Sequence, residues 1–387
     1  MSGKKIIKRT LSEELKRLSE FYAVIVITGP RQSGKTTLSK MEFPDYHYVN
    51  MENISLRHQI MESPMAFLEQ HQKGLVIDEV QNVPELFSYI QVVADNNENS
   101  RFILTGSSNF SLLEKVTQSL AGRSAILTLL PLSLQEIGNL KDKSTNQLIF
   151  WGGYPAVWGK KIPVQDVTQN YYNTYIERDV RQILNVKNLN AFQTFIRLCA
   201  GRVGTEFNAS ALSNEIGVSV PTIKEWLSVL EASYVVFRLH PFSRNIGKRL
   251  IKTPKIYFYD TALVCYLLGI ENEEQLSTHP LRGAIFENLM VLDFFKNKFN
   301  KGKIPHFYFY RDKSQIEIDL LEEKGIHLLA YEIKSATSFT KNFANNLKYL
   351  KNILGNTILS TTIIFDGNES IISNENSIVN FRDIKFD

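Results

Sequence analysis

The sequence contains little cysteine and no apolar run long enough to cross a membrane. Only two of its 387 residues are cysteines, Cys199 and Cys265, and both lie in apolar surroundings. Two lone thiols exclude the disulfide framework of a small secreted domain and suit a reducing compartment. No apolar run approaches the roughly 18 residues of a membrane helix. The basic N-terminus lacks the apolar core of a secretory signal, so we expect a cytoplasmic protein with no membrane partner.

Zinc ligands and a strong charge excess are also missing. The seven histidines are scattered, without cysteine partners at zinc spacing, which argues against a structural zinc site. The formal net charge of +4 is mild and does not by itself imply a nucleic-acid partner. With 43% hydrophobic and 22% charged residues, the composition is that of an ordinary globular protein. The length predicts about two to four domains.

A glycine-rich phosphate-binding loop follows the apolar run at residues 23–27. It consists of Gly29, Pro30, Arg31, Gln32, Ser33, Gly34, Lys35 and Thr36, followed by Thr37. This is the full spacing of a P-loop between a strand and a helix. The two glycines let successive backbone N–H groups face one anion, and the helix N-terminus adds partial positive charge. Lys35 is predicted to contact the β- and γ-phosphates of ATP, and the Thr36 hydroxyl to ligate Mg²⁺.

Strand-like runs alternate with helical patterns in the first third of the chain. The candidate strands are residues 23–28, 46–50, 74–78, 101–105 and 125–130. This alternation predicts an α/β fold with a parallel sheet and helices on both faces. The third run ends in Asp78 and Glu79, a Walker B pattern. We expect Asp78 to hold Mg²⁺ and Glu79 to act as general base on the attacking water.

Three small polar residues lie at the end of the fourth strand, and an arginine precedes the fifth. Thr105, Ser107 and Asn109 are candidates to sense the γ-phosphate, and Ser107 is preferred, although ordinary loop chemistry also explains such residues. Arg123 is a candidate arginine finger that would reach the nucleotide of a neighbouring copy. The alternative is a surface arginine that pairs with a carboxylate and contributes little.

Several motifs together resemble a bacterial and archaeal family of AAA+-type P-loop ATPases. They read GPRQSGKTTL, LVIDEVQ, RFILTGSSN, LAGR followed by LLPLSLQEI, WGGYPAVW and YIERDVRQI. Members of that family carry a C-terminal domain long labelled as of unknown function. The resemblance covers nearly the whole chain and implies ATP and Mg²⁺ as cofactors. It also implies that Arg9 lies close to the adenine.

The resemblance and the composition shifts divide the chain into four predicted parts. They are an ATPase core (1–135), a helical lid (136–195), a winged helix-turn-helix (196–255) and a C-terminal α/β domain (256–387). In the lid, Arg178 and Arg181 lie three apart on a predicted helix, so both can point to nearly one face. Arg178 is the preferred contact for the γ-phosphate, and a solvated charged face is the alternative.

The helix-turn-helix pattern covers residues 209–227. Gly217 supplies its turn and Ser219 caps the second helix. The second helix offers poor material for reading bases, whereas the expected wing is basic enough to contact phosphates without reading sequence. The basic residues are Arg238, Arg244, Lys248, Arg249, Lys252 and Lys255. A DNA-binding module and an internal connector therefore both remain open.

The C-terminal part has the predicted element order α-β-β-β-α-β and resembles the PD-(D/E)XK nuclease fold. Its acids would fall on Glu287 of the helix and on Asp319 and Glu332 of neighbouring strands, and its lysine on Lys334. The resemblance implies a second Mg²⁺ site at Asp319 and Glu332, with Lys334 orienting the water or stabilising charge. Ile318 stands where the motif expects proline.

The sequence thus supports two hypotheses about function. The first is an Mg²⁺-dependent AAA+-type ATPase that acts on DNA through the winged helix and the nuclease-like domain. The second is a nucleotide-gated switch that binds a protein partner, with a catalytically inert nuclease-like domain. An arginine finger at Arg123 would further predict a homo-oligomer. A sequence-specific transcription factor is the least favoured function, because the recognition helix has few base-reading residues.

Overall fold

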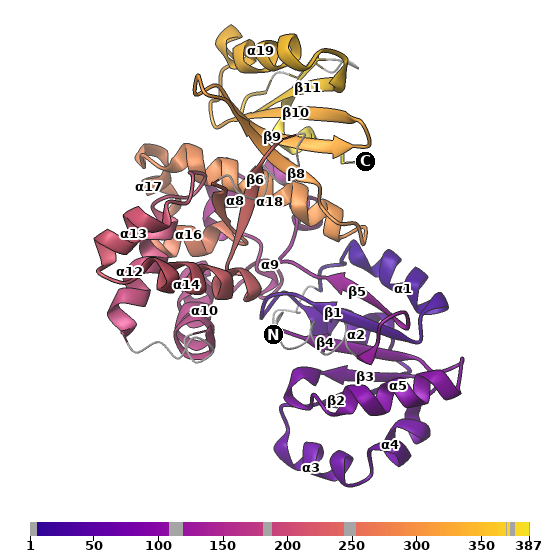
Figure 1. Cartoon of the computed structure of the whole chain (residues 1–387). Helices are drawn as coiled ribbons and strands as arrows, with labels where there is room; N and C mark the ends of the chain where they lie inside the picture. The colour runs from indigo at the N-terminus through magenta and orange to yellow at the C-terminus, as the bar shows by residue number, and fades with distance from the viewer. Residues whose placement is uncertain are drawn as a thin grey trace.

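The computed structural model describes residues 6–107, 119–180, 188–243, 253–368, 370–371 and 376–386, except for the side chains of 177–180. Two sheets stand at opposite ends of the molecule, with most of the helices of the middle of the chain between them (Figure 1). The first sheet has the order β2-β3-β4-β1-β5, and the second has the order β12-β11-β10-β9-β8-β6-β7.

The first sheet is parallel throughout, as the alternating pattern predicts. Its strands are β1 (Val24–Thr28), β2 (His47–Asn50), β3 (Leu75–Asp78), β4 (Phe102–Gly106) and β5 (Ser124–Thr128). Alternate residues of β1 face opposite sides, as a pleated strand requires. Ile25 and Ile27 pack under α1 (Leu11–Phe21) and α2 (Lys35–Glu42). Val24 and Val26 belong to the core under α3 (Ile54–Glu62), α4 (Pro64–His71) and α5 (Leu86–Asn96).

The middle of the chain is helical and shares one hydrophobic core with the C-terminal part. Its helices are α7 (Leu134–Ile137), α8 (Thr145–Trp151), α9 (Pro155–Lys160), α10 (Val164–Tyr171), the π-helix η3 (Tyr172–Val180), α12 (Leu189–Ala200), α13 (Ala209–Ile216) and α14 (Val220–Ala232). The core runs from Leu130 to Phe381 without a break at residues 195 or 255. The predicted boundary at 255/256 passes through β7 (Lys255–Phe258). The four-part division itself stays a prediction.

The helix-turn-helix pattern forms two consecutive helices, α13 and α14. Gly217 ends α13 with φ of 76°, and the Ser219 side chain accepts a hydrogen bond from the Thr222 N–H at the start of α14. The strand that follows, β6 (Val236–Pro241), pairs with β7 in antiparallel fashion and with β8 (Phe307–Arg311) in parallel. The strands expected to form a free wing are therefore the edge of the second sheet.

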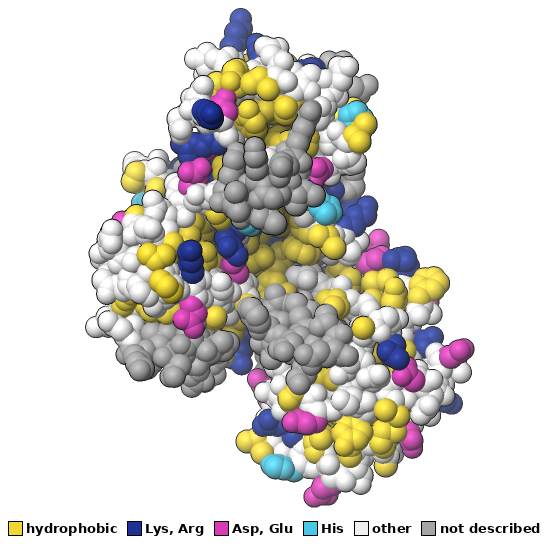
Figure 2. Space-filling model, viewed as in Figure 1, with side chains coloured by type: hydrophobic (Ala, Val, Ile, Leu, Met, Phe, Trp, Pro, Cys, Tyr) yellow, Lys and Arg dark blue, Asp and Glu magenta, His cyan; other side chains and the backbone are white. Residues whose placement is uncertain are grey.

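Of the six basic residues expected on that wing, only Arg238 and Lys255 are described, and neither is free to bind a phosphate. Lys255 is 2% exposed, so its prediction as a surface phosphate contact is wrong. Arg238 pairs with Glu231 at 2.7 Å. Residues 244–252, which include the other four basic residues, lie outside the described part of the chain. On the face shown in Figure 2, the visible Lys and Arg side chains are interspersed with acidic and uncharged groups.

The C-terminal part has the predicted order of elements. After α16 (Thr261–Leu267) and α17 (Glu273–Thr278) come α18 (Arg282–Phe299), β8, β9 (Glu317–Lys324), β10 (His327–Lys334), α19 (Asn345–Leu354), β11 (Ile358–Phe365) and β12 (Asn376–Asn380). β10 lies between β9, its antiparallel partner, and β11, its parallel partner. This arrangement places the end of β10 close to the start of β9 and beside α18.

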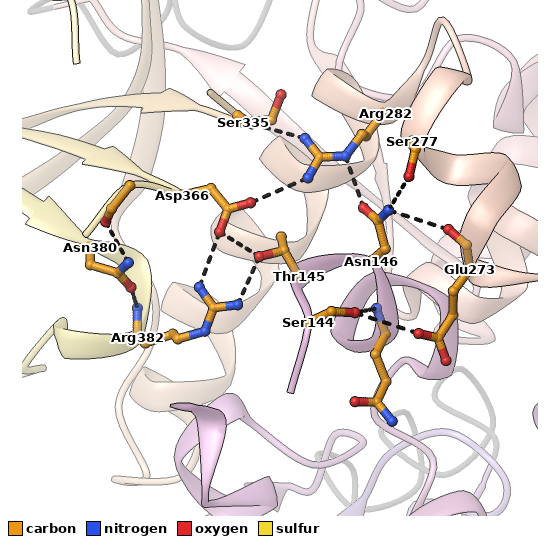
Figure 3. A network of polar contacts seen from close by, with 12 residues as sticks. Ser144, Thr145, Asn146, Glu273, Ser277, Arg282, Ser335, Asp366, Asn380 and Arg382 are labelled. Carbon is orange, nitrogen blue, oxygen red and sulfur yellow. Dashed lines mark hydrogen bonds and ion pairs between the residues drawn. The ribbon is translucent and has the colours of Figure 1, made fainter. Parts of the chain in front are cut away.

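A polar clasp fastens the middle of the chain to the C-terminal part (Figure 3). At its centre the Asp366 carboxylate, which follows β11, pairs with Arg282 at 3.2 Å and with Arg382 at 3.0 Å. Arg382 also donates to the Thr145 hydroxyl at 2.8 Å and to the Lys143 carbonyl at 3.1 Å. We refer to Asp366, Arg282, Arg382 and Thr145 as the clasp. It joins α8 to the start of α18 and to the chain after β11 and β12.

Candidate functional site

The P-loop has the backbone geometry of an anion cradle. It leaves β1 at Thr28 and enters α2 at Lys35. Gly29 has φ of 143°, and a Cβ there would lie 2.1 Å from the Leu129 carbonyl oxygen after β5. Gly34 has φ of 99° immediately before α2. Both positions therefore require glycine, as the sequence predicts.

Lys35 lies inside this loop. Its side chain is buried, and Nζ donates to the carbonyl oxygens of Gly29 and Pro30, both at 2.8 Å. Burial lowers the pKa of Lys35 to about 8, although Glu79 and Asp78 nearby favour the charged form. Two carbonyl groups of the loop thus hold the ammonium group. A phosphate oxygen could take their place as the acceptor.

Asp78 connects three strands of the first sheet. Its Oδ2 accepts hydrogen bonds from Thr36 Oγ1 and from the Tyr48 hydroxyl, both at 2.8 Å. Its Oδ1 accepts one from Thr105 Oγ1. Asp78 and Thr36, the predicted magnesium ligands, are therefore in contact. Tyr48 is not among the predicted site residues, and its place follows from the pairing of β2 with β3.

Glu79 and Ser107 also come together. Glu79 has φ of 53°, a left-handed conformation that is uncommon for a residue with a side chain. Its Oε2 accepts hydrogen bonds from Gln81 Nε2 and from Ser107 Oγ, the latter at 3.2 Å. Ser107, the preferred sensor, thus lies beside the predicted base, while Thr105 contacts Asp78 instead. Asn109 lies outside the described residues.

Arg9 links the P-loop to the chain after β5 by hydrogen bonds. Its guanidinium donates to the carbonyl oxygens of Ser33 at 2.7 Å and Leu130 at 2.6 Å, and to Glu136 at 3.0 Å. Burial alone would raise the pKa of Glu136, but Arg9 and the N–H groups of Ser133 and Thr10 bring it below its ordinary value. These contacts explain the position of Arg9 without a nucleotide, and its contact with adenine stays a prediction.

A cleft of about 850 Å³ opens above the P-loop. Residues 31–38 line one side, and Pro155, Gly159, Asn170 and Tyr175 of α9, α10 and η3 line the other. The Arg31 guanidinium lies 5.7 Å from the centre of the Tyr175 ring, within cation–π range. The volume is within the range of small-ligand sites. The segment predicted as a lid thus shares one cleft with the P-loop.

Arg178 and Arg123 are the two arginines predicted to contact a nucleotide, and only the side chain of Arg123 is described. Arg178 lies in η3, but its side chain is outside the described part, as is the whole of Arg181. Arg123 pairs with Asp95 and directly precedes β5. Because Val24 pairs with Ser124 in a parallel register, Arg123 lies a strand length, about 16 Å, from its own P-loop. The pair with Asp95 agrees with the alternative of a surface arginine, and a contact between Arg123 and the nucleotide of another copy stays a prediction.

The four residues of the predicted second site converge in the C-terminal part. Lys334 Nζ lies 2.7 Å from Glu332 Oε1 and 3.5 Å from Asp319 Oδ2, which also accepts the Ile333 N–H at 2.7 Å. Burial, and then the nearby Asp319, raise the pKa values of Glu287 and Glu332. We call Glu287, Glu317, Asp319 and Glu332 the acidic cluster.

Two further residues, Lys255 and Tyr257, contact this cluster, and neither they nor Glu317 were predicted as site residues. Lys255 Nζ lies 3.2 Å from Glu287 Oε1 and 2.6 Å from Glu317 Oε1. The Tyr257 hydroxyl donates to Glu287 Oε1 at 2.5 Å. Within the described ranges, no group of three or more His, Cys, Asp or Glu side chains is arranged to hold a metal ion. No described helix has the length and apolar character needed to cross a membrane.

Comparisons with known proteins find relatives that match most of the chain. An uncharacterized protein of Mycobacterium tuberculosis is 28% identical over 340 residues, covering 86% of this chain and 75% of the relative. An uncharacterized protein of Haemophilus influenzae is 24% identical over 396 residues, covering 92% and 94%. The Walker-type ATPase of Pyrococcus abyssi aligns with a TM-score of 0.46 at 14% identity, covering 68% of this chain and 96% of that chain.

Family models match three consecutive segments. Residues 142–274 and 282–384 match two domains of unknown function, DUF8612 and DUF4143. Residues 22–138 match the AAA domain, and this segment contains the P-loop, Asp78, Glu79 and the five-stranded parallel sheet. The chain therefore carries an AAA-type P-loop ATPase domain in residues 22–138.

Proposed function

We propose that the protein is an Mg²⁺-dependent ATPase that hydrolyses ATP in the cleft above the P-loop. The observation that carries this proposal is the meeting of Thr36 with Asp78 and of Ser107 with Glu79 at the same end of the sheet. A hydroxyl and a carboxylate are the hard oxygen ligands that Mg²⁺ prefers. Thr36 and Asp78 would hold the ion, which neutralises charge on the β- and γ-phosphates when bound.

The remaining roles fall to residues of the chain itself. The loop from Gly29 to Thr37 binds the phosphates through its backbone, and Lys35 turns from the Gly29 and Pro30 carbonyls to them. Glu79 takes the proton of the attacking water at its carboxylate. Ser107 orients Glu79 or the γ-phosphate. Arg178 reaches the γ-phosphate from the π-helix, a helix type often found at functional sites.

Replacing Lys35 by Ala tests nucleotide binding. Because a charged hydrogen bond contributes about 1.5–3 kcal/mol, we expect the affinity for a fluorescent ATP analogue to fall by roughly 10- to 100-fold or more, as measured by fluorescence titration. Lys73→Ala is the matched control, since Lys73 is exposed and precedes β3, at the amino ends of the strands and therefore away from the P-loop. Unchanged affinity in Lys35→Ala would contradict the proposed phosphate site.

We further propose that Arg123 acts in trans, within a homo-oligomer assembled with ATP. Its position at the edge remote from its own P-loop supports this proposal. Turnover per chain should then rise with protein concentration in the unaltered protein and show no such rise in Arg123→Ala. Sedimentation with an ATP analogue gives an independent readout. A chain that stays monomeric and an Arg123→Ala variant that hydrolyses ATP normally would together rule the finger out.

A second function, metal-dependent cleavage of DNA, is favoured by the C-terminal part. The supporting observation is that Glu332, which is 3% exposed, has one carboxylate oxygen that accepts no hydrogen bond. Asp319 and Glu332 would hold Mg²⁺, which polarises a phosphate and activates water when bound. Lys334 would orient the water, and Glu287 would complete the nuclease-like cluster. The helix pair α13–α14 would contact the DNA without a free wing, because β6 and β7 belong to the second sheet.

The rival proposal is a nucleotide-gated switch for a protein partner, in which the nuclease-like cluster is inert. A cleavage assay on supercoiled, linear and single-stranded DNA with Mg²⁺ or Mn²⁺ separates the two. If the cluster is active, Asp319→Ala should lower cleavage by about 100-fold, as loss of metal binding requires. Asp312→Ala is a control outside the cluster. An unaltered protein that cleaves none of the three substrates would favour the switch.

A further inference from the structure

The acidic cluster contains a buried cation of its own. Lys255 comes from β7 and is 2% exposed, yet its Nζ contacts both Glu287 and Glu317. The Phe309 ring lies beside it, with Nζ 5.5 Å from the ring centre. Because the ammonium group is enclosed and paired on two sides, it cannot exchange with solvent as a surface lysine does. It is a fixed component of the cluster.

The charges divide the cluster into two unequal halves. In the first half, the carboxylates of Glu287 and Glu317 face Lys255, and Arg311 Nε lies 3.8 Å from Glu317 Oε2. Arg311 is shared with Glu206, whose Oε2 lies 3.5 Å from Arg311 Nη1, so both cations of this half are already paired with carboxylates. In the second half, Asp319 and Glu332 share only Lys334, and Glu332 Oε2 has no hydrogen-bond partner. That oxygen is buried and has no partner among the described residues, so it is the position that a bound cation would satisfy.

The contacts of Glu287 leave it little capacity for a metal ion. Its Oε1 accepts from both Lys255 and the Tyr257 hydroxyl. Its carboxylate also lies against residue 204, where a Cβ would come within 3.6 Å of Oε1. Lys255 and Tyr257 lie in the segment that matches DUF8612, whereas Glu287 and Asp319 lie in the segment that matches DUF4143. Both segments are thus needed to build the cluster.

We propose that Lys255 takes the place of a second cation, so that the cluster binds a single divalent ion at Asp319 and Glu332. The inference rests on the metal site of the proposed second function, and it adds a charge-balancing role for a lysine from outside the nuclease-like segment. Removing the ammonium group leaves Glu287 and Glu317 without the cation that they share, while Tyr257 still contacts Glu287 and Arg311 still lies near Glu317. Such a pair suits a hard divalent cation.

Counting bound Mn²⁺ by isothermal titration and by its electron paramagnetic resonance signal tests this proposal. The full chain is used without nucleotide and with Asp78→Asn, which removes the P-loop metal ligand. We expect one Mn²⁺ per chain in this parent and two in Lys255→Met, whose side chain keeps the length without the charge. Lys255→Arg keeps the charge and should retain one. Lys255→Met with Glu287→Gln should also return to one, because the new pair is lost.

The outcomes separate this inference from the proposed metal site. One ion in both the parent and Lys255→Met, with equal affinity, overturns the role of Lys255, as do two ions in the parent. No ion in the parent but one in Lys255→Met supports Lys255 as a cation substitute and contradicts the site at Asp319 and Glu332. No ion in either variant overturns both. If Lys255→Met is unfolded, Mn²⁺ should restore its thermal unfolding transition, and failure to do so also counts against the proposal.

Discussion

Replacing Glu79 by Gln is expected to lower ATP hydrolysis by roughly 10²- to 10⁴-fold, the usual contribution of a general base, while ATP still binds. The amide keeps the shape of the side chain and its contacts with Gln81 and Ser107. It cannot take a proton from water, however. The P-loop and the Thr36–Asp78 pair are untouched, so the affinity for ATP should change little. Steady-state phosphate release, together with titration of a fluorescent ATP analogue, measures both quantities.

Glu85→Gln provides the matched control, because Glu85 is an exposed carboxylate six residues further along the chain. Its turnover should equal that of the unaltered protein. The left-handed backbone of Glu79 makes a further distinction possible. Since Gln can adopt this conformation as readily as Glu, a loss of turnover would report chemistry rather than unfolding, which circular dichroism can verify. Robust hydrolysis in Glu79→Gln would assign the base to another group.

The first sheet and the P-loop site could be predicted from the sequence because their determinants are local. Each strand is a short apolar run between turn signals, and parallel strands bring their carboxyl ends to one edge. Asp78, Glu79 and Ser107 follow such strands and therefore had to meet the P-loop. The same reasoning brought Asp319, Glu332 and Lys334 together, since the two strands were predicted to be neighbours.

The contacts that charged residues make with distant parts of the chain could not be predicted from the sequence. The sequence predicts Lys255 on a basic wing, because it lies near other basic residues. Its burial among carboxylates follows from the pairing of β6 with β8, a contact across about 70 residues that no local pattern records. The observed partners of Arg9, among them Leu130 and Glu136, are equally distant in sequence, and its contact with the adenine stays a prediction. Long-range pairing of charged groups is decided by the packing of the whole core.

The Asp366→Asn variant tests how much the long-range ion pairs of the clasp contribute to stability. Asp366 is one carboxylate shared by two arginines, and all three side chains are largely buried. Removing one partner of a buried ion pair costs about 3–5 kcal/mol, because charges are left without compensation. We expect the free energy of unfolding to fall by about 3 kcal/mol, measured as a lower urea midpoint by circular dichroism at 222 nm.

The neighbouring Asp383 supplies the control for this prediction, because it is an exposed carboxylate one residue after Arg382. Asp383→Asn should shift the free energy of unfolding by no more than about 0.5 kcal/mol. Arg382 contacts Leu140, Lys143 and Thr145 as well as Asp366. Loss of Asp366 should therefore also expose the chain around residue 143 to limited proteolysis. If Asp366→Asn is as stable and as resistant to protease as Asp383→Asn, the apolar core alone holds the middle of the chain to the C-terminal part.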